Sequence, residues 1–371
     1  MADATGASTR TTLAQVAARA GVSVSTASLA FSGSGPVSDA TRRRVLAAAE
    51  ALDYAGPDPR GRSLRQGRSG IVGVVMEDRV LTAFRDPIRI AVLDGIAQET
   101  TAQGRGLLLL SDIGAGASAI GTAGMDAAIL MGFSTRIDPA VALLRRRGLP
   151  LVAVGGPEHD AILTISIDDE AASGTAARHL AGLGHQDAVI VALPLVNLDP
   201  TTTDPAAGRG PLTGAAERTG TVRVTLERLR GVRSVFPHST GVIACGSSVD
   251  EGMVAGHALL DDPARRPTAV IAQSDLLAAG VIKAAAELGL SVPGDLSVVG
   301  FDGVALDRVI PQDLTTMVQP AAEQGRAAGR AVMDLLAGGN PTPTRFTCRF
   351  HLGATTAPPR PGRHRELTPA R

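Results

Sequence analysis

Cysteine is scarce in this chain of 371 residues, which has only Cys245 and Cys348. Neither lies in the paired spacing of a metal or redox motif, so we expect no disulfide framework. The seven histidines are scattered, without a pair at the spacing of helical metal ligands. We therefore expect neither a metal site nor a cofactor.

Long apolar runs are also missing. No stretch approaches the roughly 20 residues that a membrane helix needs, and Met1 to Arg10 lacks the charged and then apolar order of a secretory signal. With 44% hydrophobic and 19% charged residues, the composition is typical of a globular protein, and the length allows two or three domains. We expect a cytoplasmic location.

Charge is spread unevenly, although the chain as a whole has a formal net charge of zero. Residues 1–70 hold nine arginines against five acidic residues, a net charge of +4, which leaves −4 for the rest. A basic head on an acidic body suggests contact with nucleic acid at one end, although chance variation along a chain gives the same imbalance.

The segment 11–32 predicts two short helices joined by a sharp turn. In "TTLAQVAARAG" a threonine can cap the first helix, apolar residues recur at helical spacing, and Gly21 ends it. The second helix fits Val24–Phe31, opened by Ser23. Because only "GVS" separates them, the helices must pack closely through small residues. This is the helix-turn-helix arrangement, in which the second helix enters the DNA major groove.

A third helix is predicted from Ser38 in "PVSDATRRRVLAAAEALDY", with Val45, Leu46, Ala49 and Leu52 at core spacing. Its three consecutive arginines can meet phosphate oxygens or stay solvated. The alternative for the whole head is a small helical cap on an enzyme.

The motifs "TLAQVAARAGVSVSTAS" and "GPVSDATRRRVLAAAEALDY" resemble the amino-terminal domain of the lac repressor and galactose repressor family of bacterial transcription regulators. The resemblance implies binding to double-stranded operator DNA. The family often has a base-reading arginine at the position of Leu29, so we expect readout to depend on Val24, Ser25 and Thr26, with apolar contacts to thymine methyls available as well. The candidate DNA-binding residues of the head are Thr12, Leu13, Ser23, Val24, Ser25, Thr26, Ser28 and Leu29.

The segment after Tyr54, "AGPDPRGRSLRQGRSG", has the composition of a flexible basic linker. By resemblance it corresponds to a hinge that folds into a short helix on operator DNA. Leu64 would then wedge between base pairs in the minor groove, with Arg62 and Arg65 on the backbone. Gly61 stands where the family commonly has alanine, and because glycine costs about 1 kcal/mol in a helix, we expect a weaker hinge helix. An unstructured tether is the alternative.

From Ile71 onward, apolar runs such as "IVGVVM", "AAILM", "AVIVAL" and "LSVVGF" alternate with helical stretches. This alternation predicts parallel sheets with right-handed crossovers, and about 280 residues of it should form two lobes. "GAGASA", Gly114–Ala119, imitates a dinucleotide-binding loop. No acidic residue ends a strand about 20 residues later, so we interpret it as an ordinary loop.

Two further segments, "RPTAVIAQSDLLAAGVIKAAAELGLSVPGDLSVVGFDGV" and "LTTMVQPAAEQGRAAGRAVMDLL", resemble the effector domain of the same family, so the resemblance covers roughly Thr11 to Thr356. It implies an N-terminal all-α helix-turn-helix domain followed by an α/β effector domain similar to the periplasmic sugar-binding proteins. That domain would have two doubly wound lobes joined by three crossings. A sugar or related metabolite would bind between the lobes.

The carboxyl ends of parallel strands are where ligands bind in open sheets. Asp302 follows "LSVVGF", and Ser274 and Asp275 follow "TAVIA", so these side chains would reach the cleft. By resemblance, Arg228 in "ERLRGV" and Gln319 in "TTMVQP" match ligand-binding positions. The candidate effector-binding residues are Arg228, Ser274, Asp302 and Gln319.

Each candidate also has a purely structural interpretation. Ser274 or Asp275 would cap the helix that follows. Asp302 would pair with a neighbouring arginine, Arg228 would lie on a helix surface, and Gln319 would satisfy backbone groups.

Two departures from the family concern the same body. Gly155 and Gly156 follow "LPLVAV", where many members have an aspartate that binds ligand hydroxyls, so we expect a roomier or less polar pocket on that side. The segment Leu195–Gly220 is longer than the usual connection. It would be a lid, a partner contact or a disordered surface loop.

The sequence thus predicts a sequence-specific DNA-binding transcriptional regulator, a homodimeric repressor whose operator affinity a small molecule controls. The expected parts are a helix-turn-helix domain at 11–58, a hinge at 59–69, a two-lobed effector-binding and dimerisation domain at 70–356, and a disordered tail at 357–371. One rival is a binding protein without DNA activity, against which the head argues. The other is an enzyme on a doubly wound fold, for which the sequence has no nucleophile elbow, phosphate loop or metal pair.

Overall fold

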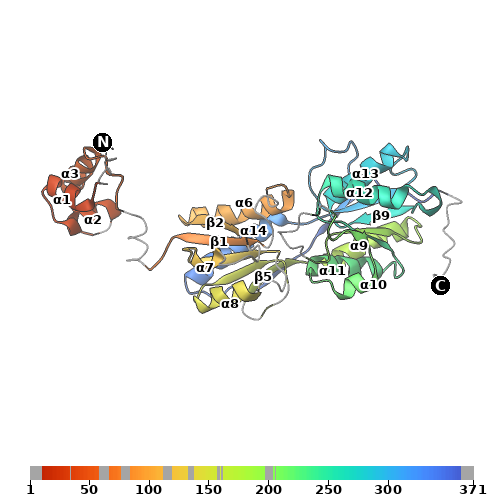
Figure 1. Cartoon of the computed structure of the whole chain (residues 1–371), viewed down its shortest axis with the longest axis horizontal. Helices are drawn as coiled ribbons and strands as arrows, with labels where there is room; N and C mark the ends of the chain where they lie inside the picture. Colours follow the sequence, from red (N-terminus) through yellow and green to blue (C-terminus); the bar gives the residue numbers. More distant parts are fainter. Residues whose placement is uncertain are drawn as a thin grey trace, which may run out of the picture. The chain divides into compact units, whose positions relative to one another are not determined.

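The computed structural model describes residues 11–33, 35–57, 67–76, 84–111, 119–132, 138–156, 159, 162–196, 204 and 206–360. The chain forms two compact units, Met1–Gly70 and Ile71–Arg371. Figure 1 labels their helices and strands. The expected hinge residues Arg62, Leu64 and Arg65, and most of the loop Gly114–Ala119, lie outside the described residues.

The first unit has the three predicted helices, α1 (Leu13–Ala20), α2 (Val24–Ser32) and α3 (Asp39–Glu50). Each begins at a hydroxyl residue whose side chain accepts a hydrogen bond from a backbone N–H of the first turn: Thr12, Ser23 and Ser38. Gly21 ends α1 with φ 63°, a left-handed conformation that favours glycine.

Small side chains fill the core of this unit, as predicted from the short turn. The buried residues are Val16, Ala17, Ala20, Ala27, Ala30, Val45, Ala48 and Ala49. The prediction was wrong for Leu46, which is 45% exposed. The buried face of α3 is formed by Val45, Ala48 and Ala49, and Leu46 lies about 100° around the helix from Val45, away from Ala48.

Lobe 1 of the second unit is a parallel sheet in the order β12-β5-β4-β3-β1-β2. Helices α6 and α14 pack together against one core, and α7 and α8 cover another (Figure 1). The strands are β1 (Ile71–Met76), β2 (Gly106–Ser111), β3 (Ala127–Met131), β4 (Leu151–Val154), β5 (Leu163–Ile167) and β12 (Thr344–Phe346). The helices are α6 (Pro87–Ala102), α7 (Ala119–Thr122), α8 (Asp138–Arg146) and α14 (Ala321–Leu336).

Lobe 2 is a second sheet in the order β13-β11-β10-β9-β6-β8-β7, with antiparallel edge strands β13 and β7. Its parallel strands are β6 (Val189–Ala192), β8 (Gly241–Ile243), β9 (Ala269–Ala272), β10 (Ser297–Asp302) and β11 (Thr315–Val318), and its edges are β7 (Gly210–Pro211) and β13 (Arg349–His351). Helices α9 (Asp169–Gly182) and α11 (Arg223–Arg233) pack together, as do α12 (Val249–Leu260) and α13 (Asp275–Glu287).

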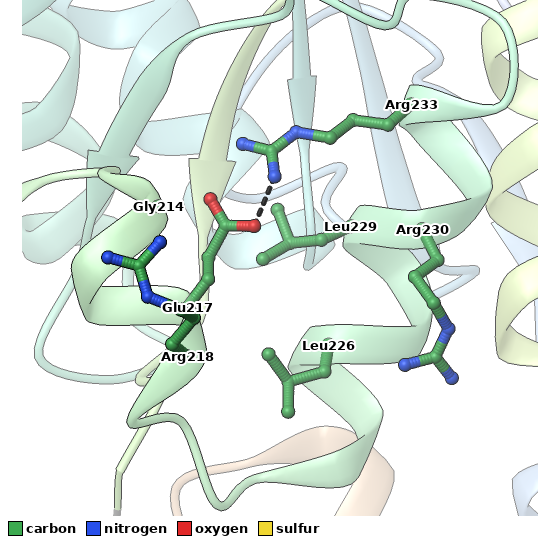
Figure 2. A pocket seen from close by; sticks show the side chains of 7 residues that line it. All are labelled: Gly214, Glu217, Arg218, Leu226, Leu229, Arg230 and Arg233. Atoms are coloured by element: carbon green, nitrogen blue, oxygen red, sulfur yellow. Dashed lines mark hydrogen bonds and ion pairs between the residues drawn. The ribbon is translucent and has the colours of Figure 1, made fainter.

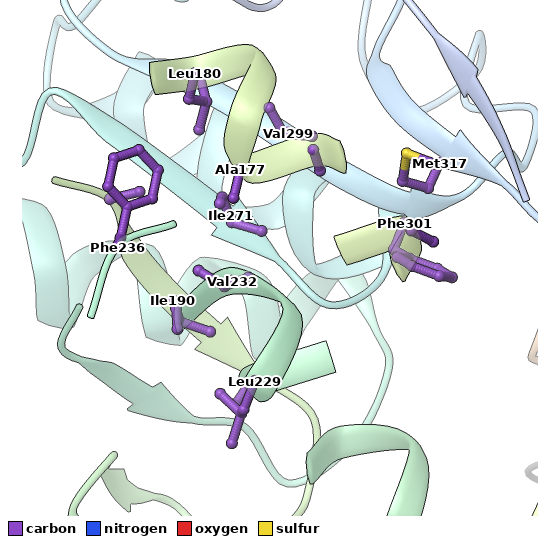
Figure 3. Packing of buried hydrophobic residues seen from close by; sticks show 14 of the residues in the cluster. Ala177, Leu180, Ile190, Leu229, Val232, Phe236, Ile271, Val299, Phe301 and Met317 are labelled. Carbon is purple, nitrogen blue, oxygen red and sulfur yellow. The ribbon is translucent and has the colours of Figure 1, made fainter. Parts of the chain in front are cut away.

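The chain crosses between the lobes three times. It passes from β5 to α9, from β11 to α14, and from β12 to β13. The predicted architecture of two doubly wound α/β lobes with three crossings is therefore confirmed. Figure 3 shows the lobe 2 core between the sheet and the pair α9 and α11, where Leu180, Leu229 and Ile271 are buried.

Two expectations about irregular segments need correction. The long segment Leu195–Gly220 contains the edge strand β7 and the short helix α10 (Gly214–Arg218), so part of it is regular structure. Residues 357–360, which we expected to belong to a disordered tail, contact lobe 2. The carbonyl of Ala357 accepts a hydrogen bond from the side chain of Ser297, and Arg360 pairs with Asp295.

Candidate functional site

The exposed face of α2 is the candidate DNA-reading surface. Val24 and Leu29 are 49% and 37% exposed, and Ser23 and Ser25 are exposed as well. The Oγ atom of Ser23 lies 2.8 Å from the hydroxyl oxygens of both Ser25 and Thr26, so Ser23 bonds to each of them. The described residues thus place most of the predicted base-contacting side chains at one end of α2.

The other predicted DNA-contacting residues of the first unit also contribute to its folding, as helix caps or by packing. Thr12 is exposed and caps α1, while Leu13 packs against the core. Ser28 is half-buried. Arg44 donates a hydrogen bond from Nε to the carbonyl of Ala20 at 2.8 Å, so it caps the end of α1 instead of staying fully solvated.

Arg228 is the centre of the candidate effector site. It projects from α11 and is only 4% exposed, which rules out the helix-surface interpretation. Its Nε donates to Oδ1 of Asp169 at 2.8 Å, and its Nη1 donates to the carbonyl of Gln273 at 2.5 Å. The guanidinium lies 3.6 Å from the centre of the Phe301 ring, a cation–π contact.

Asp302 and Gln319 join Arg228, and the pairing of Asp302 with an arginine is the structural interpretation that the sequence left open. Oδ1 of Asp302 lies 3.7 Å from Nη1 of Arg228 and accepts a hydrogen bond from Nε2 of Gln319 at 2.7 Å. Gln324, the buried glutamine of α14, donates to Oε1 of Gln319 at 3.3 Å. A polar chain therefore runs from a lobe 2 ion pair through a crossing to a lobe 1 helix.

The backbone of Asp302 is unusual, with φ 129°. Asp53 is the only other non-glycine residue with positive φ among those described. Such conformations are costly for a residue with a Cβ and tend to occur at functional sites. This conformation occurs at the end of β10, where the carboxyl group of Asp302 faces Arg228.

Ser274 and Asp275 serve mainly as structural groups. Ser274 caps α13 by accepting from the backbone N–H of Leu277 at 3.2 Å. Oδ2 of Asp275 accepts from the N–H groups of Gly303 and Val304. These contacts match the capping interpretation of Ser274, whose hydroxyl also bonds to Ser247 and lies outside the Arg228 network.

Burial shifts the pKa values of the carboxyl groups in this region upward. Burial raises the pKa of Asp169, against the opposing effect of Arg228, and raises that of Asp275. Burial raises the pKa of Asp302 well above its usual range, and the nearby charge of Asp275 adds to the shift. A buried carboxyl group can accept hydrogen bonds from the hydroxyl groups of a ligand.

A cavity of about 430 Å³ lies beside this network and is lined by both lobes. Asp169 and Glu227 come from lobe 2, and Thr164, Ser166 and Arg345 come from lobe 1. None of the four predicted effector residues lines it, but Asp169 joins it to Arg228. Sequence reasoning missed Asp169. It is the second residue after β5, and ligands in open parallel sheets bind at such strand ends.

Gly155 and Gly156 also line this cavity, with φ of 71° and 91°. Left-handed backbone of this kind favours glycine at both positions. The expected roomier side of the pocket thus coincides with a turn that needs glycine.

A second cavity, of about 480 Å³, lies between α10 and α11 (Figure 2). Leu226 and Leu229 form its apolar part, and Glu217 pairs with Arg233 across it. Arg218 and Arg230 point in different directions in Figure 2, so the arginines do not converge on one point.

Within the described ranges, no group of three or more His, Cys, Asp or Glu side chains is placed to hold a metal ion. None of the described helices combines the length and the hydropathy of a membrane span.

Comparisons with known proteins identify both kinds of domain. A family described as "Bacterial regulatory proteins, lacI family" matches residues 12–56, and one described as "Periplasmic binding protein-like domain" matches residues 177–356. An HTH-type transcriptional regulator of Mycobacterium tuberculosis is 33% identical over 365 residues, which cover 94% of this chain and 98% of that protein.

Solved structures have the same fold at lower identity. The lac repressor dimer bound to operator and an anti-inducer is 21% identical with a TM-score of 0.71, covering 94% of this chain and 99% of that chain. The complex of the transcriptional regulator CelR with cellobiose is 24% identical with a TM-score of 0.61, covering 93% and 100%.

Proposed function

Because the chain belongs to the lacI family of bacterial regulatory proteins, which are transcriptional regulators and not enzymes, we propose that it is a repressor controlled by a small molecule. The observation that carries this proposal is the presence, in one chain, of a helix-turn-helix unit and a buried Arg228–Asp302–Gln319 network beside a cavity lined by two lobes.

The DNA partner is a double-stranded operator that the protein binds as a homodimer. Two copies of α2 would occupy two half-sites of a pseudo-palindrome, and the net charge of +4 over residues 1–70 would favour the phosphate backbone. The lac repressor dimer bound to operator supports this arrangement by its shared fold. Arg62 and Leu64 would contact the minor groove between the half-sites.

The effector is a sugar or a related polyhydroxylated metabolite. Vicinal hydroxyls would donate to the carboxyl groups of Asp302 and Asp169, and the Arg228 fork would hold acceptor oxygens. The cellobiose complex of CelR supports the ligand class by analogy of fold. Gln319 would complete the site by fixing the orientation of the Asp302 carboxyl group.

Control arises because the cavity has walls in both lobes. An effector that bonds to Asp169 of lobe 2 and to Thr164 or Arg345 of lobe 1 binds the open and closed arrangements with different affinity. That difference in affinity shifts the equilibrium between them and thereby the affinity for the operator.

We place the working parts at 11–58 for DNA binding, 59–69 for the hinge and 70 onward for effector binding and dimerisation. The division of the chain after Gly70 supports the last boundary.

The test has two stages. Purified full-length protein is used to select bound fragments from random duplex DNA, and a panel of sugars is then screened for loss of binding to the selected site. We expect one symmetric site and at least one sugar that changes the affinity for it. No preference for any duplex over competitor DNA would overturn the proposal.

A further inference from the structure

Two large apolar side chains of α2 are exposed. Val24 and Leu29 are among the few large hydrophobic side chains that the described residues leave exposed, at 49% and 37%. The helix VSTASLAFS has no charged side chain and no amide side chain.

Two hydroxyl side chains of α2, those of Ser25 and Thr26, bond to the cap residue Ser23. Ser23 accepts from the backbone N–H of Thr26 at 3.1 Å, and its oxygen lies 2.8 Å from the hydroxyls of Ser25 and Thr26. Two-point recognition of guanine uses arginine or lysine, and that of adenine uses asparagine or glutamine. None of these four residue types occurs on α2.

Hydrogen bonds are not the sole means of base recognition in the major groove. Thymine alone of the four bases has a methyl group there, and apolar side chains pack against it. Val24 is the first residue of α2, and Leu29 lies five residues later, about 7.5 Å along the helix axis and about 140° around it. The two side chains are therefore far enough apart to meet different base pairs.

We propose that this protein recognises its half-site mainly through thymine methyl groups packed against Val24 and Leu29. The inference rests on the proposed function, since it requires α2 to enter the major groove. The binding partner of Val24 and Leu29 is thus DNA, and the base pairs that they contact are T·A pairs. Because each contact buries about one methyl group, removing one methyl weakens binding by about fourfold.

The experiment starts from the selected operator and uses full-length protein at one fixed salt concentration, because affinity for DNA depends strongly on salt. Each thymine of a half-site is replaced in turn by deoxyuridine, which lacks only the methyl group. We expect about fourfold weaker binding at one or two positions of each half-site. A second series replaces the same T·A pairs by C·G and by 5-methylcytosine·G, and the methylated pair should bind more tightly than the unmethylated one.

The protein variants are Val24→Ala and Leu29→Ala, with Leu46→Ala as the matched control. Leu46 is an exposed aliphatic side chain of the same unit, 45% exposed, but it lies on α3. We expect the deoxyuridine effect to disappear at one position in Val24→Ala and at another in Leu29→Ala, and to persist in Leu46→Ala. The deoxyuridine series on the unaltered protein tests the proposal even where a variant fails to fold.

The outcomes separate the two proposals. If an operator is selected but no thymine is sensitive to deoxyuridine, methyl recognition is wrong while the regulator assignment stands. The same holds if both alanine variants keep the full deoxyuridine effect at every position. If no operator is selected, the proposed function fails first.

Discussion

Nε of Arg228 on α11 donates a hydrogen bond of 2.8 Å to Oδ1 of Asp169 on α9, and both side chains are nearly excluded from solvent. The pair joins two helices that pack on the same face of the lobe 2 sheet. Taking two charges out of water is costly, and the arrangement is tolerable because Arg228 also bonds to the Gln273 carbonyl and stacks on Phe301. Arg228 therefore belongs both to the candidate effector site and to the packed interior of lobe 2.

Arg228→Ala should destabilise the protein strongly. The change leaves the carboxyl groups of Asp169 and Asp302 buried without their cation, and breaking a buried pair from one side costs about 3–5 kcal/mol of unfolding free energy. Urea denaturation gives the value. Arg230→Ala is the control, because Arg230 is 55% exposed and pairs with Glu170 at the surface, where such pairs contribute about 1 kcal/mol or less. Equal losses of unfolding free energy in the two variants would contradict a stabilising role of the buried Arg228.

Asp302→Asn should remove the response to the effector without weakening operator binding. The amide has nearly the shape of the carboxyl group and can still accept from Gln319, but one of its acceptor oxygens becomes a donor. We expect about tenfold weaker effector binding, because one hydrogen bond from a ligand hydroxyl is lost. Fluorescence anisotropy on labelled operator with the screened sugar measures both affinities.

The control for this variant is Asp307→Asn, since Asp307 is exposed in the turn that follows. It should leave the effector response unchanged. A full response in Asp302→Asn would place the effector away from the Arg228 network.

Helix caps can be predicted from the sequence because they depend on residues that are close together in the chain. Thr12, Ser23 and Ser38 were recognisable as caps because the backbone N–H groups that they satisfy lie within three residues. The strand β12 was missed because it has only three residues, Thr344–Phe346, without a buried run. Strands of that length are defined by their partner, here β5, and not by their own pattern.

The same distinction applies to the effector site. Strand ends and family position predicted Asp302 and Gln319, which the structure brings within 2.7 Å of each other. Asp169 lies 59 residues before Arg228 in the chain, and no periodicity relates the two. Their contact depends on how α9 packs against α11, so it required the three-dimensional structure.

His185 should make the protein less stable in mild acid. It is buried, contacts the hydroxyls of Thr268 and Ser297, and donates from Nε2 to the carbonyl of Ala357. Burial lowers its pKa below 6.5. The unfolded chain therefore takes up a proton at a pH at which the folded chain does not. Stability is full above about pH 6.5 and falls as the pH drops below it toward the folded pKa.

Thermal denaturation between pH 7.5 and pH 5 tests this expectation. His185→Gln should lower the Tm at neutral pH, because hydrogen bonds to the C-terminal segment are lost, but should reduce the fall in Tm on acidification. His238→Gln serves as the control, since His238 is exposed. An acid-induced fall of equal size in His185→Gln and in the unaltered protein would assign it to other groups.

Gly95→Ala should separate two helices that the lobe 1 core requires to be close. A Cβ at Gly95 of α6 would lie 2.2 Å from the carbonyl oxygen of Ala322 on α14, and backbone cannot turn aside as a flexible side chain does. Overpacking of this kind costs about 1–3 kcal/mol, which exceeds the helix propensity of about 1 kcal/mol that alanine gains over glycine. Gly182→Ala in α9 is the matched control, because nothing lies within 4 Å of its added Cβ, and it should be neutral or stabilising. Urea denaturation that finds Gly95→Ala as stable as Gly182→Ala would show that α6 and α14 can move apart freely.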